Sequence, residues 1–256
     1  MFQEEKNNLI IYPLPVLQDN IVWAMVSGNN AVIVDPSITE PIENWLKSKD
    51  LNLLAILQTH HHEDHIGGTK NLLKEWPNAE VIASAADLSR IPFQTISVKE
   101  GDLINLMNLT VQVLEVPGHT KTHIAFFINN ESYNLTTNKP VLFCGDTLFA
   151  GGCGRLFEGT PKDMFLSLNK LNSFPLDTKV YCAHEYTEAN LRWANSLFPE
   201  NIEIKNRLEK VVKQRQEGLL TLPSSLSEER KTNLFIQAKS INEFSYLREH
   251  KDSWSN

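Results

Sequence analysis

One stretch of the chain decides how the rest is interpreted: Thr59-His60-His61-His62-Glu63-Asp64-His65-Ile66-Gly67-Gly68. It holds four of the eight histidines within six positions. The apolar run 53–57 before it is typical of a buried strand, and residues 68–76 after it have helical spacing. A histidine cluster between a buried strand and a helix indicates a metal site.

The order of residues in this stretch suits two neighbouring metal ions. Side chains alternate along an extended chain, so His60 and His62 face one way and His61 faces the other. A turn at Asp64 and His65 lets a carboxylate and an imidazole face a second ion, because divalent metals accept nitrogen and oxygen ligands together. A solvated polar loop is the alternative, and it does not explain this order.

Three more candidate ligands follow apolar runs elsewhere in the chain. His119 comes after the run 111–116, Asp146 after 141–144 and His184 after 180–182. Each could be an ordinary turn residue, since Gly-His and Gly-Asp pairs also punctuate loops. Considered with the histidine cluster, they complete a set of nitrogen and oxygen ligands.

Composition excludes several classes of protein. The 256 residues include 24 basic and 31 acidic side chains, a net charge of -7, which argues against a nucleic-acid partner. No apolar run is long enough to span a bilayer, and the amino terminus does not resemble a signal peptide. The three cysteines form no CxxC pair. We expect a cytoplasmic monomer without a membrane partner.

The chain divides into two regions of different periodicity. Strand-like and helical segments alternate up to about residue 183, starting with a predicted meander over 9–34. A helix is predicted to start after Thr160, with Pro161 in its first turn. After His184, helical spacing prevails, and Ser240 with Glu243 predicts a capping box for the last helix. We therefore expect an α/β domain over 1–184 and a small all-helical domain over 185–256.

The ligand pattern resembles that of the metallo-β-lactamase superfamily, in which His-x-His-x-Asp-His is followed by a later His, a bridging Asp and a last His. The resemblance implies an αββα four-layer sandwich, with the C-terminal helical domain attached. It also implies that two divalent metal ions are bound. The implied ligands of the first metal are His60, His62 and His119; those of the second are Asp64, His65 and His184; Asp146 bridges the two.

Residues 145–160 narrow the resemblance to the glyoxalase II family, and residues 183–187 and 247–252 match as well. In that family, the positions of Arg155, Tyr186, Arg248 and Lys251 contact glutathione, the last two from the helical domain. Phe157 stands where some members have a tyrosine, so a contact there would be made by the backbone.

The resemblance implies an enzyme that hydrolyses S-D-lactoylglutathione to D-lactate and glutathione, the second step of methylglyoxal detoxification. The implied nucleophile is a hydroxide that bridges the metals, with Asp64 and Asp146 as the catalytic carboxylates. Zinc is the expected metal, and iron or manganese are alternatives because they accept the same ligands. Cys153 is interpreted as structural.

Other functions on the same scaffold stay open at this point. A lactonase or β-lactamase would share the ligands but lack Arg248 and Lys251, and a glutathione persulfide dioxygenase would use a single iron. A non-catalytic metal-binding module is the alternative from another class. The remaining histidines, His61, His123 and His250, are expected to be structural. Glu63, Glu185 or a backbone group could accept the second N–H of the ligand imidazoles.

Overall fold

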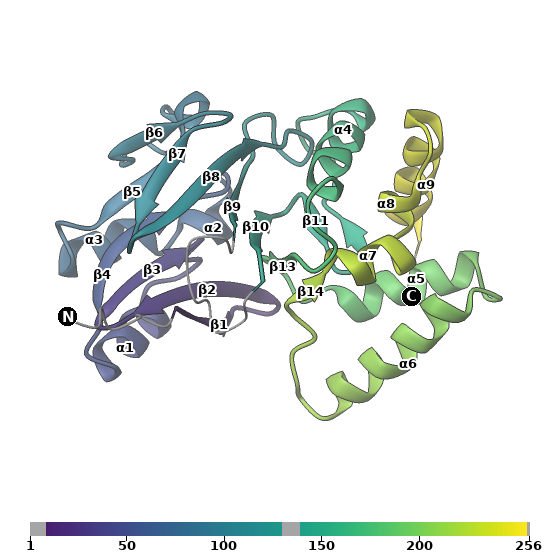
Figure 1. Cartoon of the computed structure of the whole chain (residues 1–256), viewed down its shortest axis with the longest axis horizontal. Helices are drawn as coiled ribbons and strands as arrows, with labels where there is room; N and C mark the ends of the chain where they lie inside the picture. The colour runs from purple at the N-terminus through teal and green to yellow at the C-terminus, as the bar shows by residue number, and fades with distance from the viewer. Residues whose placement is uncertain (1–8, 130–138, 255–256) are drawn as a thin grey trace, which may run out of the picture. The chain divides into compact units, whose positions relative to one another are not determined.

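The computed structural model describes residues 9–129 and 139–254, and the chain forms two compact units (Figure 1). The first comprises residues 1–114 and 126–141, and the second comprises 115–125 and 142–256. Each unit carries part of the predicted site.

A six-stranded sheet organises the first unit. Its first three strands form the predicted antiparallel meander, and the third to sixth strands are parallel neighbours. The strands lie in chain order: β1 (Ile10–Val16), β2 (Asn20–Ser27), β3 (Asn30–Val34), β4 (Asn52–Leu57), β5 (Glu80–Ser84) and β6 (Ile96–Val98).

Helices α1 (Glu40–Ser48) and α3 (Thr69–Glu75) contribute to the core of this sheet. Ile42 and Leu46 of α1 and Leu72 of α3 are fully buried among apolar side chains of β2 to β5. Burying three such side chains stabilises the unit by several kcal/mol, at about 1.5 to 3 kcal/mol each. The one-turn helix α2 (Glu63–Ile66) was not predicted.

The carboxyl ends of β3 and β4 meet at one edge of the sheet because the two strands are parallel. Asp35, just after β3, donates its backbone N–H to the carbonyl of Leu57 at 2.9 Å. The histidine cluster directly follows β4. Gly68 is required beside it, since a Cβ there would lie 2.7 Å from the carbonyl oxygens of Pro36 and Ile38.

The antiparallel pair β7 (Leu103–Leu106) and β8 (Leu109–Glu115) lies in the first unit except for Glu115, and residues 126–128 of the buried strand β9 (Ile124–Ile128) belong to it as well. In the second unit, which includes all of β10 (Val141–Gly145) except Val141, the strands β14 (Ser224–Ser225), β13 (Lys179–Cys182) and β10 are neighbours in that order. β11 (Leu148–Phe149) and β12 (Gly152–Cys153) form a short antiparallel pair directly after β10. β6, β7, β11, β12 and β14 were not predicted.

Helices make up most of the second unit: α4 (Pro161–Asn172), α5 (Thr187–Leu197), α6 (Ile202–Gln216), α7 (Leu226–Thr232), α8 (Leu234–Gln237) and α9 (Ile241–Ser253). The Thr160 cap of α4 is confirmed. The predicted capping box of α9 is only half formed. The Ser240 hydroxyl accepts a hydrogen bond from the Glu243 N–H, but the Glu243 carboxylate accepts from the N–H of Lys239 instead of that of Ser240. No helix in the described ranges is both long and apolar enough to cross a membrane.

A buried polar cluster ties α7 to the hairpin of β11 and β12. Glu229, fully buried, accepts hydrogen bonds from Arg207 at 2.7 Å, from the backbone of Gly151 at 2.7 Å and from Asn233 at 3.0 Å. Asn233 also donates to the carbonyl of Gly152 at 2.9 Å. The helical segment is thus anchored to the hairpin by specific polar contacts.

Candidate active site

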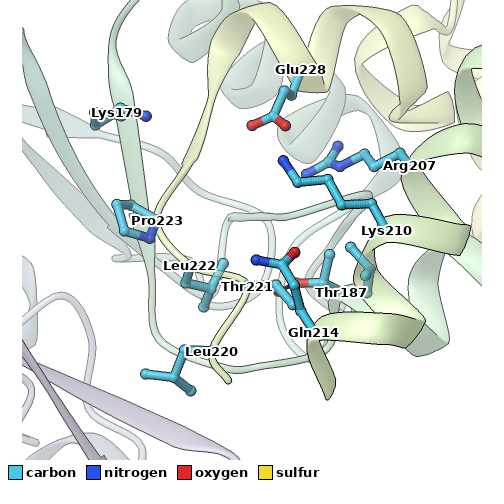
Figure 2. A pocket seen from close by; sticks show the side chains of 11 residues that line it. Lys179, Thr187, Arg207, Lys210, Gln214, Leu220, Thr221, Leu222, Pro223 and Glu228 are labelled. Atoms are coloured by element: carbon cyan, nitrogen blue, oxygen red, sulfur yellow. Dashed lines mark hydrogen bonds between the residues drawn. The ribbon is translucent and has the colours of Figure 1, made fainter. Parts of the chain in front are cut away.

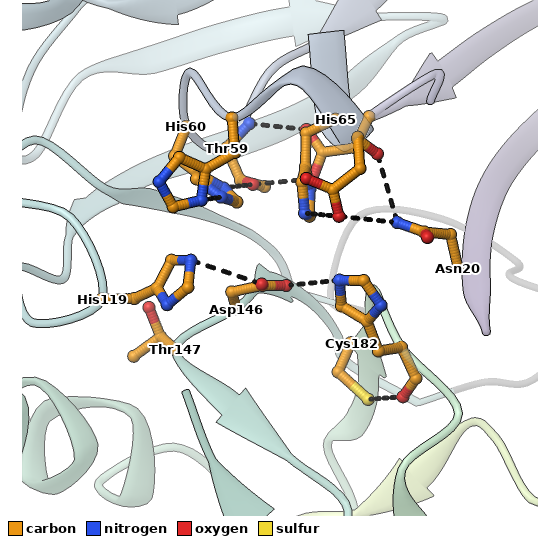
Figure 3. Close-up of polar contacts among 12 residues, drawn as sticks. Asn20, Thr59, His60, His65, His119, Asp146, Thr147 and Cys182 are labelled. Atoms are coloured by element: carbon orange, nitrogen blue, oxygen red, sulfur yellow. Dashed lines mark hydrogen bonds and ion pairs between the residues drawn. The ribbon is translucent and has the colours of Figure 1, made fainter. Parts of the chain in front are cut away.

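The first unit brings four of the predicted metal ligands together, of which His60 and His65 are labelled in Figure 3. Nε2 of His60 lies 3.1 Å from Nδ1 of His62, and Nε2 of His65 lies 3.5 Å from Oδ2 of Asp64. The rings of His60 and His65 are 4.0 Å apart between centroids. Asn20 donates to the Asp64 carboxylate at 3.1 Å and so orients it.

The hydrogen bonds behind these imidazoles determine which nitrogen faces the site. Thr59 donates its hydroxyl to Asp35 at 2.6 Å, so its oxygen accepts from Nδ1 of His60 at 3.1 Å. Asp35 also accepts from Nδ1 of His65 at 3.1 Å. Both rings therefore carry their proton on Nδ1 and present the lone pair of Nε2, the form in which imidazole binds a metal.

The second unit brings the other three predicted ligands together. Nε2 of His119 and Nε2 of His184 each lie 3.4 Å from an oxygen of Asp146, on opposite sides of its carboxylate. Nδ1 of His119 donates to the carbonyl of Arg155 at 2.9 Å, so its Nε2 has a lone pair facing a carboxylate oxygen. Two such electron-rich atoms repel each other unless a proton or a cation lies between them.

His123 and Gly154 both lie against the backbone of Asp146. Its backbone N–H donates to Nε2 of His123 at 3.1 Å, so Nδ1 of His123 carries the proton and faces the hydroxyl of Thr147 at 3.3 Å. His123 therefore has a structural role, as expected. A Cβ on Gly154 would lie 2.0 Å from the Asp146 carbonyl oxygen, so only glycine allows the following loop to approach this closely.

The donor set of both groups suits a divalent metal. It consists of imidazole nitrogens and carboxylate oxygens without a thiolate, a combination that binds zinc, iron or manganese. Further hydrogen bonds fix the ring nitrogens of His60, His65 and His119, as is usual for metal ligands. The chain therefore carries residues fitted to a divalent metal site.

Asp35 is the functional residue that sequence reasoning missed. It is buried, its backbone is left-handed with φ of 51°, and its carboxylate orients Thr59 and His65. Glu185, a predicted candidate for such a role, instead accepts hydrogen bonds from Thr187 and Thr221. His61 faces Asp87 at 3.6 Å, which agrees with its expected structural role.

A pocket of about 240 Å³ lies in the second unit near Thr187 and Thr221 (Figure 2). Lys179, Lys210 and Glu228 contribute charged groups to its lining. None of the predicted metal or substrate residues lines it. The Thr187 and Thr221 hydroxyls beside it hold Glu185, so this region anchors the chain just after His184.

The predicted substrate residues Tyr186 and Phe157 lie against metal-ligand candidates. The ring of Tyr186 stacks on His184 at 4.8 Å with an interplanar angle of 2°. Phe157 is 64% exposed, its ring is 5.2 Å from that of His119, and its backbone N–H donates to the His119 carbonyl at 3.2 Å. Both aromatic rings therefore border the ligand set of this unit.

The three predicted substrate-binding cations gather around the end of α9. Arg248 is buried and donates to the carbonyl of Cys153 at 3.0 Å and to Asp252 at 2.8 Å. Arg155, whose side chain is 69% exposed, lies 3.7 Å from the same oxygen of Asp252. Within the described residues, the Lys251 ammonium makes no hydrogen bond or ion pair, and its contact is the ring of Trp193.

Burial changes the titration of two groups here. Burial, and next the Arg248 guanidinium, lower the pKa of Lys251 to about 8. Burial also raises the pKa of the Cys153 thiol above its ordinary value, which the nearby Arg248 opposes only in part. Cys153 is therefore a protonated thiol at neutral pH and not an activated nucleophile.

Two family models match successive parts of the chain. The metallo-β-lactamase superfamily model matches residues 18–184, and the model of the hydroxyacylglutathione hydrolase C-terminus matches residues 185–254. A hydroxyacylglutathione hydrolase of Prochlorococcus marinus strain NATL1A is 58% identical over 98% of this chain and 98% of its own. The chain belongs to the hydroxyacylglutathione hydrolase family.

Two solved structures are similar in fold to this member of the hydroxyacylglutathione hydrolase family. ETHE1 from Myxococcus xanthus superposes with a TM-score of 0.69 at 24% identity, covering 94% of this chain and 90% of that one. TTHA1623 in a di-iron-bound form is 31% identical, with a TM-score of 0.51, over 68% of this chain and 91% of that one. The predicted metallo-β-lactamase fold with a C-terminal helical domain, and the predicted hydrolase class, are confirmed.

Proposed function

We propose that this protein hydrolyses the thioester of S-D-lactoylglutathione to D-lactate and glutathione, the second step of methylglyoxal detoxification. The match of residues 185–254 to the hydroxyacylglutathione hydrolase C-terminus carries the proposal, because that segment holds Arg248 and Lys251. In this proposal residues 1–184 form the metal-binding catalytic domain and residues 185–256 the glutathione-binding domain.

The seven ligand candidates are assigned to two divalent ions. The geometry within each unit supports this, since ring nitrogens face carboxylate oxygens at 3.4 to 3.5 Å. The di-iron form of TTHA1623 is a related case. Zinc is our first choice, with iron and manganese as alternatives. The first ion would be held by His60, His62 and His119 and the second by Asp64, His65 and His184, and Asp146 would be a ligand of both.

Such ions, when bound, lower the pKa of a water to roughly 7 and polarise a carbonyl oxygen. The residues of the chain orient the reacting groups: Asp64 and Asp146 act as the catalytic carboxylates that hold the attacking water. The water gives up a proton to solvent as its oxygen bonds to the acyl carbon, the carbon–sulfur bond breaks, and the sulfur leaves as glutathione thiolate, which takes up a proton from solvent. Because a thiol has a pKa of about 8.5, no strong general acid is required.

Recognition of glutathione is assigned to the cations around α9. Glutathione carries two carboxylates and one ammonium, and a protein of net charge -7 needs local cations to hold it. Lys251 makes no ion pair with the described residues, and Arg155 is largely exposed, so both can bind a carboxylate. Arg248 fixes the position of α9 through Cys153 and Asp252. Tyr186 and Phe157 are assigned to the walls of this binding site.

We further propose a cytoplasmic monomer. All three cysteines, Cys144, Cys153 and Cys182, are free and buried, which fits a reducing compartment.

The test is an assay of the purified protein after metal analysis. S-D-lactoylglutathione is compared with a thioester that lacks glutathione and with a β-lactam, and oxygen uptake is recorded with glutathione persulfide. Chelator-sensitive hydrolysis of the glutathione thioester alone would support the proposal. Oxygen uptake, or lactam turnover without thioester turnover, would refute it in favour of another member of the superfamily.

A further inference from the structure

Two stacked aromatic rings lie beneath the two cations of α9. Trp193 of α5 and Phe235 of α8 are fully buried, with ring centroids 5.2 Å apart and an interplanar angle of 16°. The Lys251 ammonium lies 4.9 Å from the centroid of Trp193, and the Arg248 guanidinium carbon lies 5.1 Å from that of Phe235. Each ring of the stack therefore carries one cation.

This placement compensates for an unfavourable pair of charges. Lys251 and Arg248 are three residues apart on one helix; Arg248 is buried and Lys251 is half-buried. A desolvated cation next to a like charge is disfavoured unless negative potential lies nearby. The face of an indole ring provides it, and a cation–π contact contributes about 0.5 to 2 kcal/mol, more for Trp than for Phe.

The two cations depend on the rings to different degrees. Arg248 is also held by the Cys153 carbonyl and by Asp252. Lys251 makes no hydrogen bond or ion pair with the described residues, so the indole of Trp193 is its main support.

Other contacts fix the orientation of the Trp193 ring. Its indole N–H donates to Nδ1 of His250 at 3.2 Å, which ties α5 to α9 one residue before Lys251. Phe235, on which the indole stacks, packs in turn on Phe244 at 5.4 Å. The indole therefore presents a rigid face, so the lysine it supports is held in place before any ligand arrives.

We propose that Trp193 is a positioning residue that keeps Lys251 charged and oriented to receive a carboxylate of the glutathione part of the substrate, with Phe235 supporting the indole from below. This inference rests on the proposed function. Preorganising a charged group lowers the cost of binding and leaves the bond-breaking step unaffected. Trp193 should therefore affect KM for glutathione thioesters and leave kcat unchanged.

The kinetic test compares Trp193→Leu, which removes the π face, with Trp193→Phe, which keeps a weaker one. We expect KM for S-D-lactoylglutathione to rise about tenfold in the Leu variant, about threefold in the Phe variant, and kcat to stay within twofold. Trp45→Leu is the matched control, because Trp45 carries Lys49 at 5.8 Å but lies in the first unit. The KM of Trp45→Leu for S-D-lactoylglutathione should equal that of the wild type.

A second readout separates this inference from the proposed function. The pKa of Lys251 can be measured from the pH dependence of its labelling by an amine reagent, followed by mass spectrometry, whatever the substrate is. Loss of the indole should increase the acid dissociation constant of Lys251 about threefold or more. An unchanged constant in both folded variants would overturn the inference, and so would an equal rise of KM for a thioester without glutathione. Inactivity of the wild type towards glutathione thioesters would refute the proposed function alone.

Discussion

Lys251 provides the sharpest prediction, because its pKa lies within the range in which the enzyme can be assayed. Burial first, and then the Arg248 and Arg155 cations, lower the pKa to about 8, while the Asp252 carboxylate opposes the shift. A lowered pKa means that the charged form is lost as the pH rises through 8. We therefore expect the binding of a glutathione carboxylate to weaken between pH 7 and pH 9.

The size of the effect follows from the titration. With a pKa of about 8, roughly nine-tenths of Lys251 is charged at pH 7 and roughly one-tenth at pH 9. If only the ammonium holds the carboxylate, KM rises about tenfold over this range and kcat stays unchanged. The substitution Lys251→Arg should abolish the rise, since a guanidinium stays charged throughout.

The assay is a series of initial rates with S-D-lactoylglutathione from pH 6.5 to 9.5 on wild type, Lys251→Arg and Lys251→Gln. The amino group of the substrate also titrates in this range, but it does so equally for all three proteins. We expect Lys251→Gln to have a high KM at every pH. A wild-type profile that matches that of Lys251→Arg would refute the reasoning, because the titrating group would then not be Lys251.

Other predictions follow from single contacts. Asp35→Asn weakens the acceptor of the His65 N–H, so we expect metal affinity to fall about tenfold or more, measured by competition with a chromophoric chelator; unchanged affinity would contradict the role of Asp35. Gly154→Ala places a Cβ against the Asp146 carbonyl, and we expect metal content and activity to fall together by elemental analysis and assay. Glu229→Gln leaves a buried arginine without its charge partner and should lower the free energy of unfolding by about 3 kcal/mol in urea denaturation, whereas a change below 1 kcal/mol would argue against a stabilising cluster. Dialysis against a chelator should abolish thioester hydrolysis, and zinc, iron and manganese added back separately should identify the metal that restores it.

Most regular elements could be predicted because their periodicity is strong. The helix Ile202–Gln216 has the bounds expected from its helical spacing, and the Thr160 cap is formed as expected. The elements that were missed are short. Leu103–Leu106 has an exposed leucine at its start, and Leu234–Gln237 is a single turn, so neither presents enough residues to show a period.

The ligand residues could be predicted from local order, but the contacts that orient them could not. Asp35 is followed by proline and looks like a strand breaker. It reaches Thr59, 24 residues later, and His65, 30 residues later, because β3 and β4 pair in parallel. The local sequence pattern does not specify that pairing. The same holds for the Arg155 carbonyl, which accepts a hydrogen bond from Nδ1 of His119, 36 positions earlier in the chain. Long-range partners of this kind depend on the topology of the chain.

The buried polar cluster around Glu229 limits which C-terminal segments can be exchanged between members of this family. Its carboxylate and the amide of Asn233 are satisfied by the backbone of Gly151 and Gly152, which lie more than 70 residues earlier in the chain. A C-terminal segment grafted onto another scaffold would leave these buried groups facing a foreign hairpin. Chimeras joined at residue 185 should therefore be soluble only if residues 149–153 are transplanted from the same parent.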